Sequence, residues 1–486
     1  MHQVKSIIQK KISTTPYLFI NLIFAFFPVS FILGSFFVNL NSLLFCCLGI
    51  YYLKSKIIRT EFNFSIKIIF LFFLIIFFST FISFVKTLYF EGYNSINVIP
   101  TCVDTNCLSP LSRLIKSILF FRFFLFLIIV YLLSKFNILN FKYFFLTAAL
   151  SPVLLSTDII YQYIFGYNIV GLKSSGFQNS GFFGDEYIAG GFIQRFAFFA
   201  ILFTILAFKN NNYAKFISTT FVICILSAGI LFAGNRMPLI LFIFGLCLVL
   251  FFNLKIKKIL LVSFIALFIL IQFIISSNES YKIYLGEVYE SFFAHASTLI
   301  NITGIQKAKK ITRVDDKLQQ SKTTFFEAQY EGLHRRIFLA AIDTWKFNKI
   351  FGGGIKSFRE NCWKLEKQSD INLSDKLLPD KKNRLCSNHP HNYYFEILTE
   401  TGIVGLSVIL IIALSFVVFI FKNFKFVKQI NIENLILLAA ILSLILETLP
   451  LRSTGSLFSS NNATYVTLIS SIVLIHKILI KTNNSK

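Results

Sequence analysis

The sequence predicts an all-α polytopic membrane protein with about twelve transmembrane helices and one large, partly helical loop on the non-cytoplasmic side. Apolar residues form 55% of the 486-residue chain. They are collected into runs of roughly 18 to 23 residues with few charges, the length that a helix needs to cross the hydrocarbon core. Lysine and arginine gather in every second connection between these runs, as is typical of cytoplasmic loops.

The apolar runs are close to unbroken, as in Ile68 to Ile82 and Ile259 to Ile275. Because lipid offers the backbone no hydrogen-bond partner, only helices and closed barrels span a bilayer. Barrel strands alternate polar and apolar residues, and these runs do not, so they predict helices. The expected spans are residues 17–34, 37–53, 67–86, 116–134, 143–165, 187–207, 214–232, 238–253, 256–276, 393–421, 432–449 and 462–480.

The basic residues give these spans an orientation. A formal net charge of +24 would indicate nucleic acid in a soluble protein, but in a membrane protein it reports topology, so we expect no nucleic-acid partner. With a cytoplasmic N-terminus, the inside connections hold Lys5, Lys10, Lys11, Lys54, Lys56, Arg59, Lys67, Lys135, Lys142, Lys209, Lys215, Lys255, Lys257, Lys258, Lys422, Lys425 and Lys428. The short outside connections hold few. We therefore expect both termini in the cytoplasm and an uncleaved first span.

Cysteine placement agrees with this topology. Four of the eight cysteines fall in predicted spans, and Cys102, Cys107, Cys362 and Cys386 fall in outside segments. An oxidising compartment permits disulfides there. Cys102–Cys107 and Cys362–Cys386 are the expected bridges, and four unpaired thiols are the alternative.

The chain divides into spans one to nine (residues 1–276), a large outside loop (277–391) and spans ten to twelve (392–486). A loop of that length is uncommon without a function. Within it we predict helices over Tyr281 to Ile300 and His334 to Ile350. The second has an apolar stripe that should pack the loop against itself or the membrane surface, and the glycines at 352–354 should end it.

The densest polar cluster lies where the loop re-enters the membrane. His389 and His391 stand two apart there, before a predicted helix whose first turns hold Glu396 and Glu400. Such a group can supply a general base whose pKa is set by nearby charge. The alternatives are interfacial packing and helix capping by Asn392. The spacing matches no dedicated zinc pattern, so we expect no metal.

Arginine is scarcer than lysine, so outside arginines are informative. Arg236 lies in a tight outside connection, and Arg335 and Arg336 open the amphipathic loop helix. A guanidinium fits phosphate oxygens bidentately, so these residues suit a lipid diphosphate. Arg122 and Arg195 lie within spans, where lipid-headgroup contact is an equal alternative.

Two adjacent carboxylates, Asp185 and Glu186, precede the sixth span on the outside. They are candidates for binding a metal or sugar hydroxyls. Equally, they are suited to stabilising the N-terminus of the following helix.

The second half of the chain resembles the O-antigen ligase and polymerase superfamily of bacterial envelope glycan assembly. The resemblance rests on HPHNYYFEILTETGIVGL from His389, on RRIFLAAIDTWKFNKIFGGGIKSF from Arg335 and on GNRMP around Arg236. It covers roughly residues 180 to 460. The twelve-span layout with one large late loop is also similar.

The resemblance implies a GT-C-type glycosyltransferase of the bacterial inner membrane that works without cofactor or metal, with the long loop in the periplasm. The donor would be an undecaprenyl-pyrophosphate-linked glycan and the acceptor a lipid A-core sugar. Arg236 and one of Arg335 or Arg336 would bind the diphosphate. His391 would deprotonate or orient the acceptor hydroxyl with His389 in support, or the two would exchange roles.

Two other readings remain open from the sequence. A polymerase that joins lipid-linked repeat units shares the same motifs. A flippase or other transporter of lipid-linked glycans would need charges lining an intramembrane cavity, and the spans offer few beyond Arg122, Asp158, Arg195 and Glu447. No internal repeat of the kind usual in transporters is visible.

Overall fold

The computed structural model describes residues 17–57, 60–100, 107–176, 178–251, 257–277, 333–367, 384–427 and 430–484. Over these ranges the chain is helical, and its only extended pairing is an isolated bridge between Tyr167 and Lys173. The predicted loop helix over Tyr281 to Ile300 lies outside the described residues.

Every predicted span contains a helix. The spans hold α2 (Leu18–Ala25), α3 (Phe27–Leu33), α4 (Ser35–Leu53), α5 (Phe64–Glu91), α6 (Pro110–Lys135), α7 (Phe141–Phe165), α8 (Ala189–Ala207), α9 (Asn212–Phe232), α10 (Arg236–Phe251), α11 (Lys257–Ser277), α16 (Tyr393–Val427), α17 (Ile432–Glu447) and α18 (Ser460–Asn484). The loop holds α14 (Leu333–Phe347) and α15 (Phe358–Lys367), and short turns form η1 (Lys54–Lys56), η2 (Tyr93–Asn97) and η3 (Gly181–Phe183).

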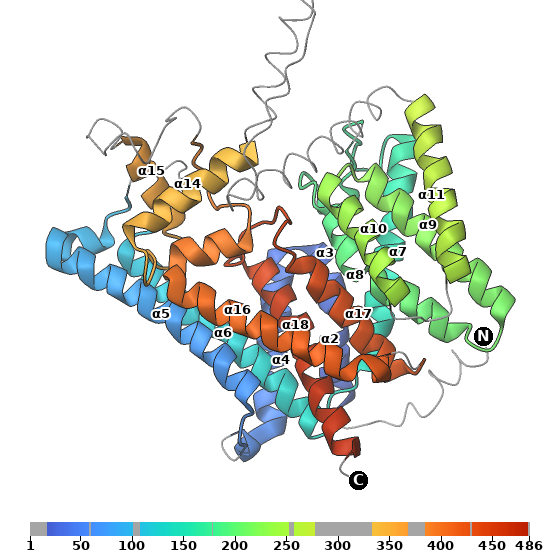
Figure 1. Ribbon diagram of the computed structural model, residues 1–486, viewed down its shortest axis with the longest axis horizontal. Helices are drawn as coiled ribbons and strands as arrows, with labels where there is room; N and C mark the ends of the chain where they lie inside the picture. The colour runs from blue at the N-terminus through green and yellow to red at the C-terminus, as the bar shows by residue number, and fades with distance from the viewer. Residues whose placement is uncertain are drawn as a thin grey trace, which may run out of the picture.

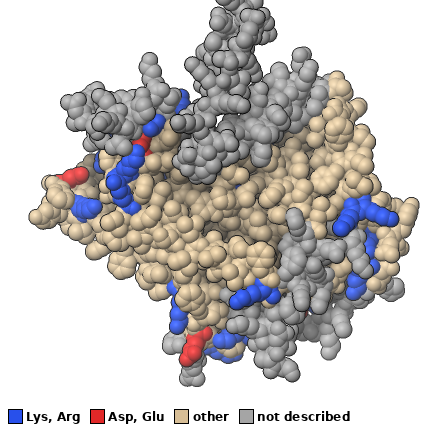
Figure 2. Space-filling model, in the orientation of Figure 1, with Lys and Arg blue, Asp and Glu red and all other residues tan. Residues whose placement is uncertain are grey.

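Eight of the described helices are long and apolar enough to cross a membrane. A polytopic helical membrane protein is thus confirmed, while twelve spans and a GT-C architecture stay predictions. In Figure 2 the described charged side chains lie toward the edges of the visible face, with a broad uncharged surface between them. That distribution fits a belt of lipid around the helices.

The first predicted span differs from a single helix. It is broken into α2 and α3, with Pro28 in the first turn of α3. Proline lacks an N–H and its ring clashes with the turn before it, so it is best tolerated at a helix start. Gly34, with a φ of 100°, ends α3 and begins α4.

Helix α8 lies in the core of the bundle. It packs against α7, α9, α10 and α17, and most of its residues are buried. Figure 1 shows α5 and α6 on one side of the bundle, α7 to α11 on the other, and α16 crossing in front between them. Helix α8 therefore brings Arg195 into the interior, next to α17.

The loop helices α14 and α15 lie over one end of the bundle (Figure 1). The predicted helix from His334 is confirmed as α14, and its stripe residues Ile337, Phe338 and Ala341 are buried. Phe338 stacks on Phe395 of α16 with ring centroids 5.0 Å apart. The amphipathic face therefore packs partly on the end of a membrane helix.

The glycine turn, residues 352–354 after α14, hydrogen-bonds the kinked part of α16 and so fixes the loop to this helix. The amides of Gly353 and Gly354 donate to the carbonyls of Thr399 and Glu400 at 3.0 and 2.9 Å. Gly402, with a φ of 67°, is non-helical inside α16, and a Cβ there would collide with the Ile350 carbonyl. Glycine is thus required by both its backbone angle and the close approach.

Candidate functional site

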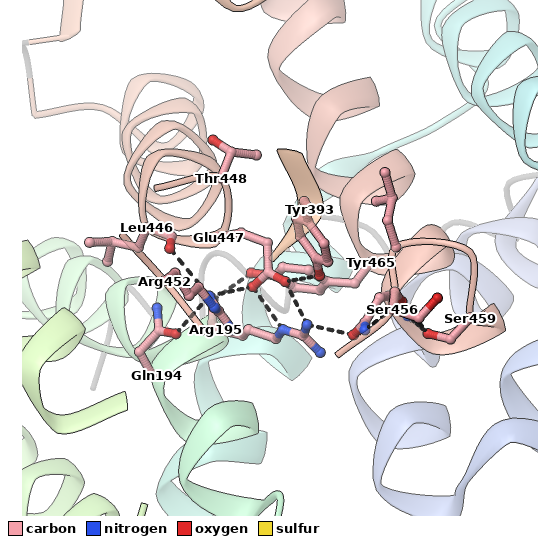
Figure 3. A network of polar contacts seen from close by, with 12 residues as sticks. Gln194, Arg195, Tyr393, Leu446, Glu447, Thr448, Arg452, Ser456, Ser459 and Tyr465 are labelled. Atoms are coloured by element: carbon pink, nitrogen blue, oxygen red, sulfur yellow. Dashed lines mark hydrogen bonds and ion pairs between the residues drawn. The ribbon is translucent and has the colours of Figure 1, made fainter. Parts of the chain in front are cut away.

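Glu447, at the end of α17, is the centre of a buried charged network (Figure 3). Arg195 of α8 donates to it through Nε at 2.9 Å and through one Nη at 2.6 Å. Arg452 approaches Oε2, which also accepts from Arg195 Nε, at 2.7 Å, and the Tyr393 hydroxyl donates to Oε1 at 2.7 Å. One carboxylate thus organises two guanidinium groups.

Further contacts fix the two arginines. Arg195 donates to Asn462 at 2.7 Å and lies over the Tyr465 ring, 4.6 Å from its centroid. Arg452 donates to the side chain of Gln194 at 3.3 Å. Such bidentate and stacked geometry is available to arginine but not to lysine.

The Glu447 network borders a cavity of about 340 Å³. Arg195, Arg452, Asn462, Tyr465 and residues of the α17–α18 connection line it. The side chain of Glu447 is fully buried, whereas those of Arg195 and Arg452 keep 17% and 8% exposure. Two cations against one carboxylate leave a positive excess at the cavity, which favours an anionic ligand.

The histidine motif is held at the start of α16. Asn392 caps that helix, because its Oδ1 accepts from the amides of Tyr394 and Phe395 at 3.0 and 3.3 Å. Its Nδ2 donates to the carbonyl of Pro450 at 2.7 Å. The predicted cap is therefore present, and it also ties the motif to the α17–α18 connection.

His391 adopts a φ of 53°, which is uncommon for a residue other than glycine. Its carbonyl accepts from the amide of Thr454 at 2.9 Å, and its Nε2 lies 3.3 Å from Ser387 Oγ. Backbone angles of this kind persist where the surroundings enforce them, often at functional sites.

The two histidine rings lie 4.2 Å apart between centroids. His389 hydrogen-bonds the backbone of Thr454, and its Nε2 has no partner among the described residues. Burial, together with Lys356 for His389 and with His389 for His391, lowers the pKa of each ring to about 4. Both rings are therefore neutral at pH 7.

Glu396, one turn into α16, is fully satisfied. It accepts from the Ser456 hydroxyl at 2.5 Å and from the Leu457 amide at 2.6 Å. Lys356 lies 3.8 Å away and also bonds Ser456. Glu400, one turn further, is buried and accepts from the amide of Lys356. These contacts give both glutamates a role in joining the loop to α16.

The connection between α17 and α18 joins the cavity to the histidine motif. Arg452 and Thr454 line the cavity, and Thr454 bonds the backbone of His391. Ser456 bonds Glu396. The five residues 452–456 therefore contact Glu447, the His391 backbone and Glu396.

Arg236 begins α10 at the edge of the cavity. Its neighbours Asn235 and Pro238 line the cavity, and Asn235 is fixed by bonds to Tyr187 and Gly190. Arg236 itself is half-buried. The chain neighbours of Arg236 thus line the cavity, whereas Arg236 itself is not among the lining residues.

Arg336, on the loop helix α14, lies away from the cavity. Arg336 donates to the carbonyl of Arg384 at 3.3 Å, and its own carbonyl accepts from Leu385. Arg384 in turn pairs with Asp343 at 2.6 Å. The side chain of Arg335 lies outside the described residues. Arg336 therefore contacts the segment before the histidines and does not line the cavity.

Asp185 and Glu186 are exposed in the turn before α8. The next two residues, Tyr187 and Ile188, line the cavity, but the two carboxylates do not. Among the described residues, no group of three or more His, Cys, Asp or Glu side chains is arranged to hold a metal ion.

Cys362 of α15 and Cys386 form a disulfide with a Cα–Cα distance of 5.6 Å. Cys107 is also disulfide-bonded, while Cys102 lies outside the described residues. The Cys362–Cys386 bridge fastens α15 three residues before His389.

Sequence reasoning missed the pairing of Arg195 and Arg452 on Glu447, and it gave no role to Lys356. Arg195 and Glu447 were visible as intramembrane charges, but 252 residues separate them. Mutual neutralisation of opposite charges in apolar spans was the only available signal.

A search of curated proteins finds no match to this chain. A family model described as O-Antigen ligase matches residues 219–410. That segment contains Arg236, α14, α15, the histidine motif and the kink of α16, but not Arg195, Glu447 or Arg452. Over this segment, the chain is similar to the O-antigen ligase family.

Proposed function

We propose that this protein transfers a glycan from undecaprenyl pyrophosphate to a sugar hydroxyl of lipid A-core, on the periplasmic face of the inner membrane and without a metal. The observation that carries the proposal is the placement of two buried arginines, sharing one carboxylate, at a cavity beside a neutral histidine pair. The family match supports the reaction class.

The diphosphate would bind in the cavity. Arg195 and Arg452 supply fixed guanidinium groups, and Arg236 adds a third cation at the edge. One of Arg335 or Arg336 remains a proposed ligand from the loop. Preorganised cations are most effective where charge develops in the transition state, which here is the departing diphosphate.

The acceptor hydroxyl would be oriented by His391, with His389 in support. Its oxygen attacks the anomeric carbon, the bond from that carbon to the diphosphate oxygen breaks, and undecaprenyl pyrophosphate leaves with the electron pair. The hydroxyl proton passes to the histidine. Since a base of pKa about 4 is weak at neutral pH, proton transfer would accompany bond formation rather than precede it.

This role predicts a pH profile. A lowered pKa keeps the histidines neutral and active as acceptors until the pH falls through the folded value. Transfer should therefore be half-lost near pH 4 instead of near about 6.5, the ordinary value. Initial rates at saturating donor and acceptor measure this, and a midpoint near the ordinary value would contradict the assignment.

The deciding experiment is complementation of a deletion strain. Arg236→Ala and His391→Ala should each abolish glycan attachment while the protein still accumulates in the membrane, and Lys67→Ala, a change of an exposed lysine on α5, should complement fully. Normal attachment by either site variant would count against the proposal.

The glycan phenotype of the deletion itself separates the reaction classes. Unmodified core with full-length lipid-linked polymer indicates a ligase. Core bearing a single repeat unit indicates a polymerase, and donor retained on the cytoplasmic leaflet indicates a transporter.

A further inference from the structure

A second, smaller cavity lies at the end of α5, separate from the Glu447 network. It measures about 170 Å³ and is enclosed by the last turns of α5, the start of α6, the glycine turn and α15. This volume is below that of pockets for drug-sized ligands. It suits one sugar ring or one head group, not an oligosaccharide or an acyl chain.

A buried ion pair forms part of the cavity wall. Arg113 Nη1 lies 3.1 Å from Glu360 Oε2, and the two side chains are only 6% and 9% exposed. Lys364 contacts the other Glu360 oxygen at 2.7 Å. Oε2 of Glu360 accepts no hydrogen bond from the described residues. Desolvating such a pair is costly, and further polar contacts would offset that cost.

The remaining lining is rich in hydrogen-bonding groups. Asn348 and Asn361 present amides, Ser83 and Thr87 present hydroxyls, and Lys86 reaches Asn348 at 3.4 Å. Amides beside a carboxylate and guanidinium can bond the neighbouring hydroxyls of a sugar. Lys86, Arg113 and Lys364 outnumber the carboxylates Glu91 and Glu360 among the lining residues, so the cavity also favours a negative charge.

A disulfide and backbone hydrogen bonds connect the walls of the cavity to the histidine motif and to α16. Cys362, two residues from Glu360 and Lys364 on α15, is bridged to Cys386. The glycine turn that contributes Gly352 to the cavity is bonded to α16 through Gly353 and Gly354. Figure 2 shows charged side chains of both signs at the corner where α5 meets α14 and α15.

From these observations we infer that this cavity is a subsite for a phosphorylated sugar of the acceptor glycan. The inference rests on the proposed function for the identity of the acceptor, but the binding chemistry stands on the cavity alone. A head group of an anionic phospholipid carries the same phosphate and hydroxyl groups, so the test must separate the two sources.

The first arm measures binding without any transfer reaction. The full-length protein in nanodiscs of zwitterionic lipid is titrated with a hexose phosphate, and heat or a thermal shift is recorded. Lys86→Ala and Lys364→Ala should each raise Kd about tenfold through loss of a charge-assisted contact. Lys86→Arg should retain most of the affinity, and Lys67→Ala, on the same helix, should match the unmodified protein.

Equal affinity in all variants would overturn the inference. So would failure of hexose phosphate to bind while nanodiscs containing anionic lipid raise the melting temperature in a Lys86-dependent manner, because that result assigns the cavity to a head group.

The second arm uses transfer kinetics. Lys86→Ala should raise KM for the acceptor about tenfold while KM for the donor stays constant, and hexose phosphate should compete with the acceptor. A parallel rise in both KM values would contradict the subsite. If no transfer is found with any protein, the proposed function fails, whereas the binding arm still decides the sugar-phosphate inference.

Discussion

Two buried glutamates of this protein, Glu447 and Glu396, hold basic residues in different ways. Glu396 accepts two short hydrogen bonds and has one nearby lysine, so its charge is balanced and its surroundings are closed. Glu447 holds two arginines that retain exposure to a cavity. The Glu396 contacts therefore join segments of the chain, whereas the Glu447 contacts leave two guanidinium groups available to a ligand.

The burial of a charged residue therefore does not by itself identify a binding site. In a balanced buried ion pair, the attraction between the charges roughly offsets the cost of removing them from water. Such a pair adds little net stability but fixes the geometry of the segments that it joins. A surplus of one sign beside a cavity is unfavourable unless a ligand of the opposite sign completes it. By this criterion we propose the Glu447 network as the binding site and the Glu396 network as its support.

The largest expected effect is on stability at the closed network. Glu396→Ala leaves Lys356 buried without its closest carboxylate, and breaking a buried pair in this way costs about 3–5 kcal/mol. The melting temperature of the purified protein should fall markedly, with Glu433→Ala on the exposed start of α17 as the control. An unchanged melting temperature would show that the Glu396 contacts do not stabilise the fold.

At the open network the loss should appear in rate. Arg195→Lys keeps one charge but loses the fork that bonds Glu447 and Asn462, so transfer should fall by about 10²- to 10³-fold. Arg122→Lys, a change of an arginine that hydrogen-bonds Ser460 and lies over the Phe123 ring, is the matched control. Equal losses in both variants would show that neither arginine is specific to the reaction.

Removing the Cys362–Cys386 disulfide tests how far the loop is stabilised independently of the two glutamate networks. The Cys362→Ser and Cys386→Ser double variant releases a crosslink over 24 residues, and such crosslinks stabilise by about 2–4 kcal/mol. Protease cleavage should increase within the loop before the membrane helices unfold. The Cys46→Ser variant, in which a free thiol on α4 is lost, should show the digestion pattern of the unmodified protein.

The smallest expected effect is at the helix cap. Asn392→Ala removes the bonds to Tyr394 and Phe395 and should cost about 1 kcal/mol. Because Nδ2 also bonds the Pro450 carbonyl, Asn392→Asp keeps the cap but loses that tie. A melting temperature lowered in Ala but not in Asp would assign the effect to capping, and one lowered equally in both would assign it to the tie.

The sequence predicted the helices well because each apolar run carries its own signal. The run 143–165 was found to within two residues of α7, whereas the kink of α16 at Gly402 was not predicted, because it depends on the close approach of Ile350. Pro28 could have predicted the break between α2 and α3, because proline disfavours a helix interior. The length of the apolar run instead led to the prediction of a single span.

The site was predicted only where its residues are neighbours in the chain. His389, His391 and Asn392 form a motif, and the structure keeps them together. Arg195, Glu447 and Arg452 come together only through packing of α8 against α17. Local patterns cannot report such a contact, and the placement of Arg336 against Arg384 likewise depends on how the loop folds.

The hydrogen bond from the Thr454 amide to the His391 carbonyl bears on the order of substrate addition. Arg452 and Thr454 are two residues apart, so an anion that displaced the Arg452 backbone would also disturb the bond that holds His391 in its left-handed conformation. Loading of the lipid carrier would then set the histidine before the sugar hydroxyl arrives. Such an enzyme would follow a compulsory sequence with the carrier bound first.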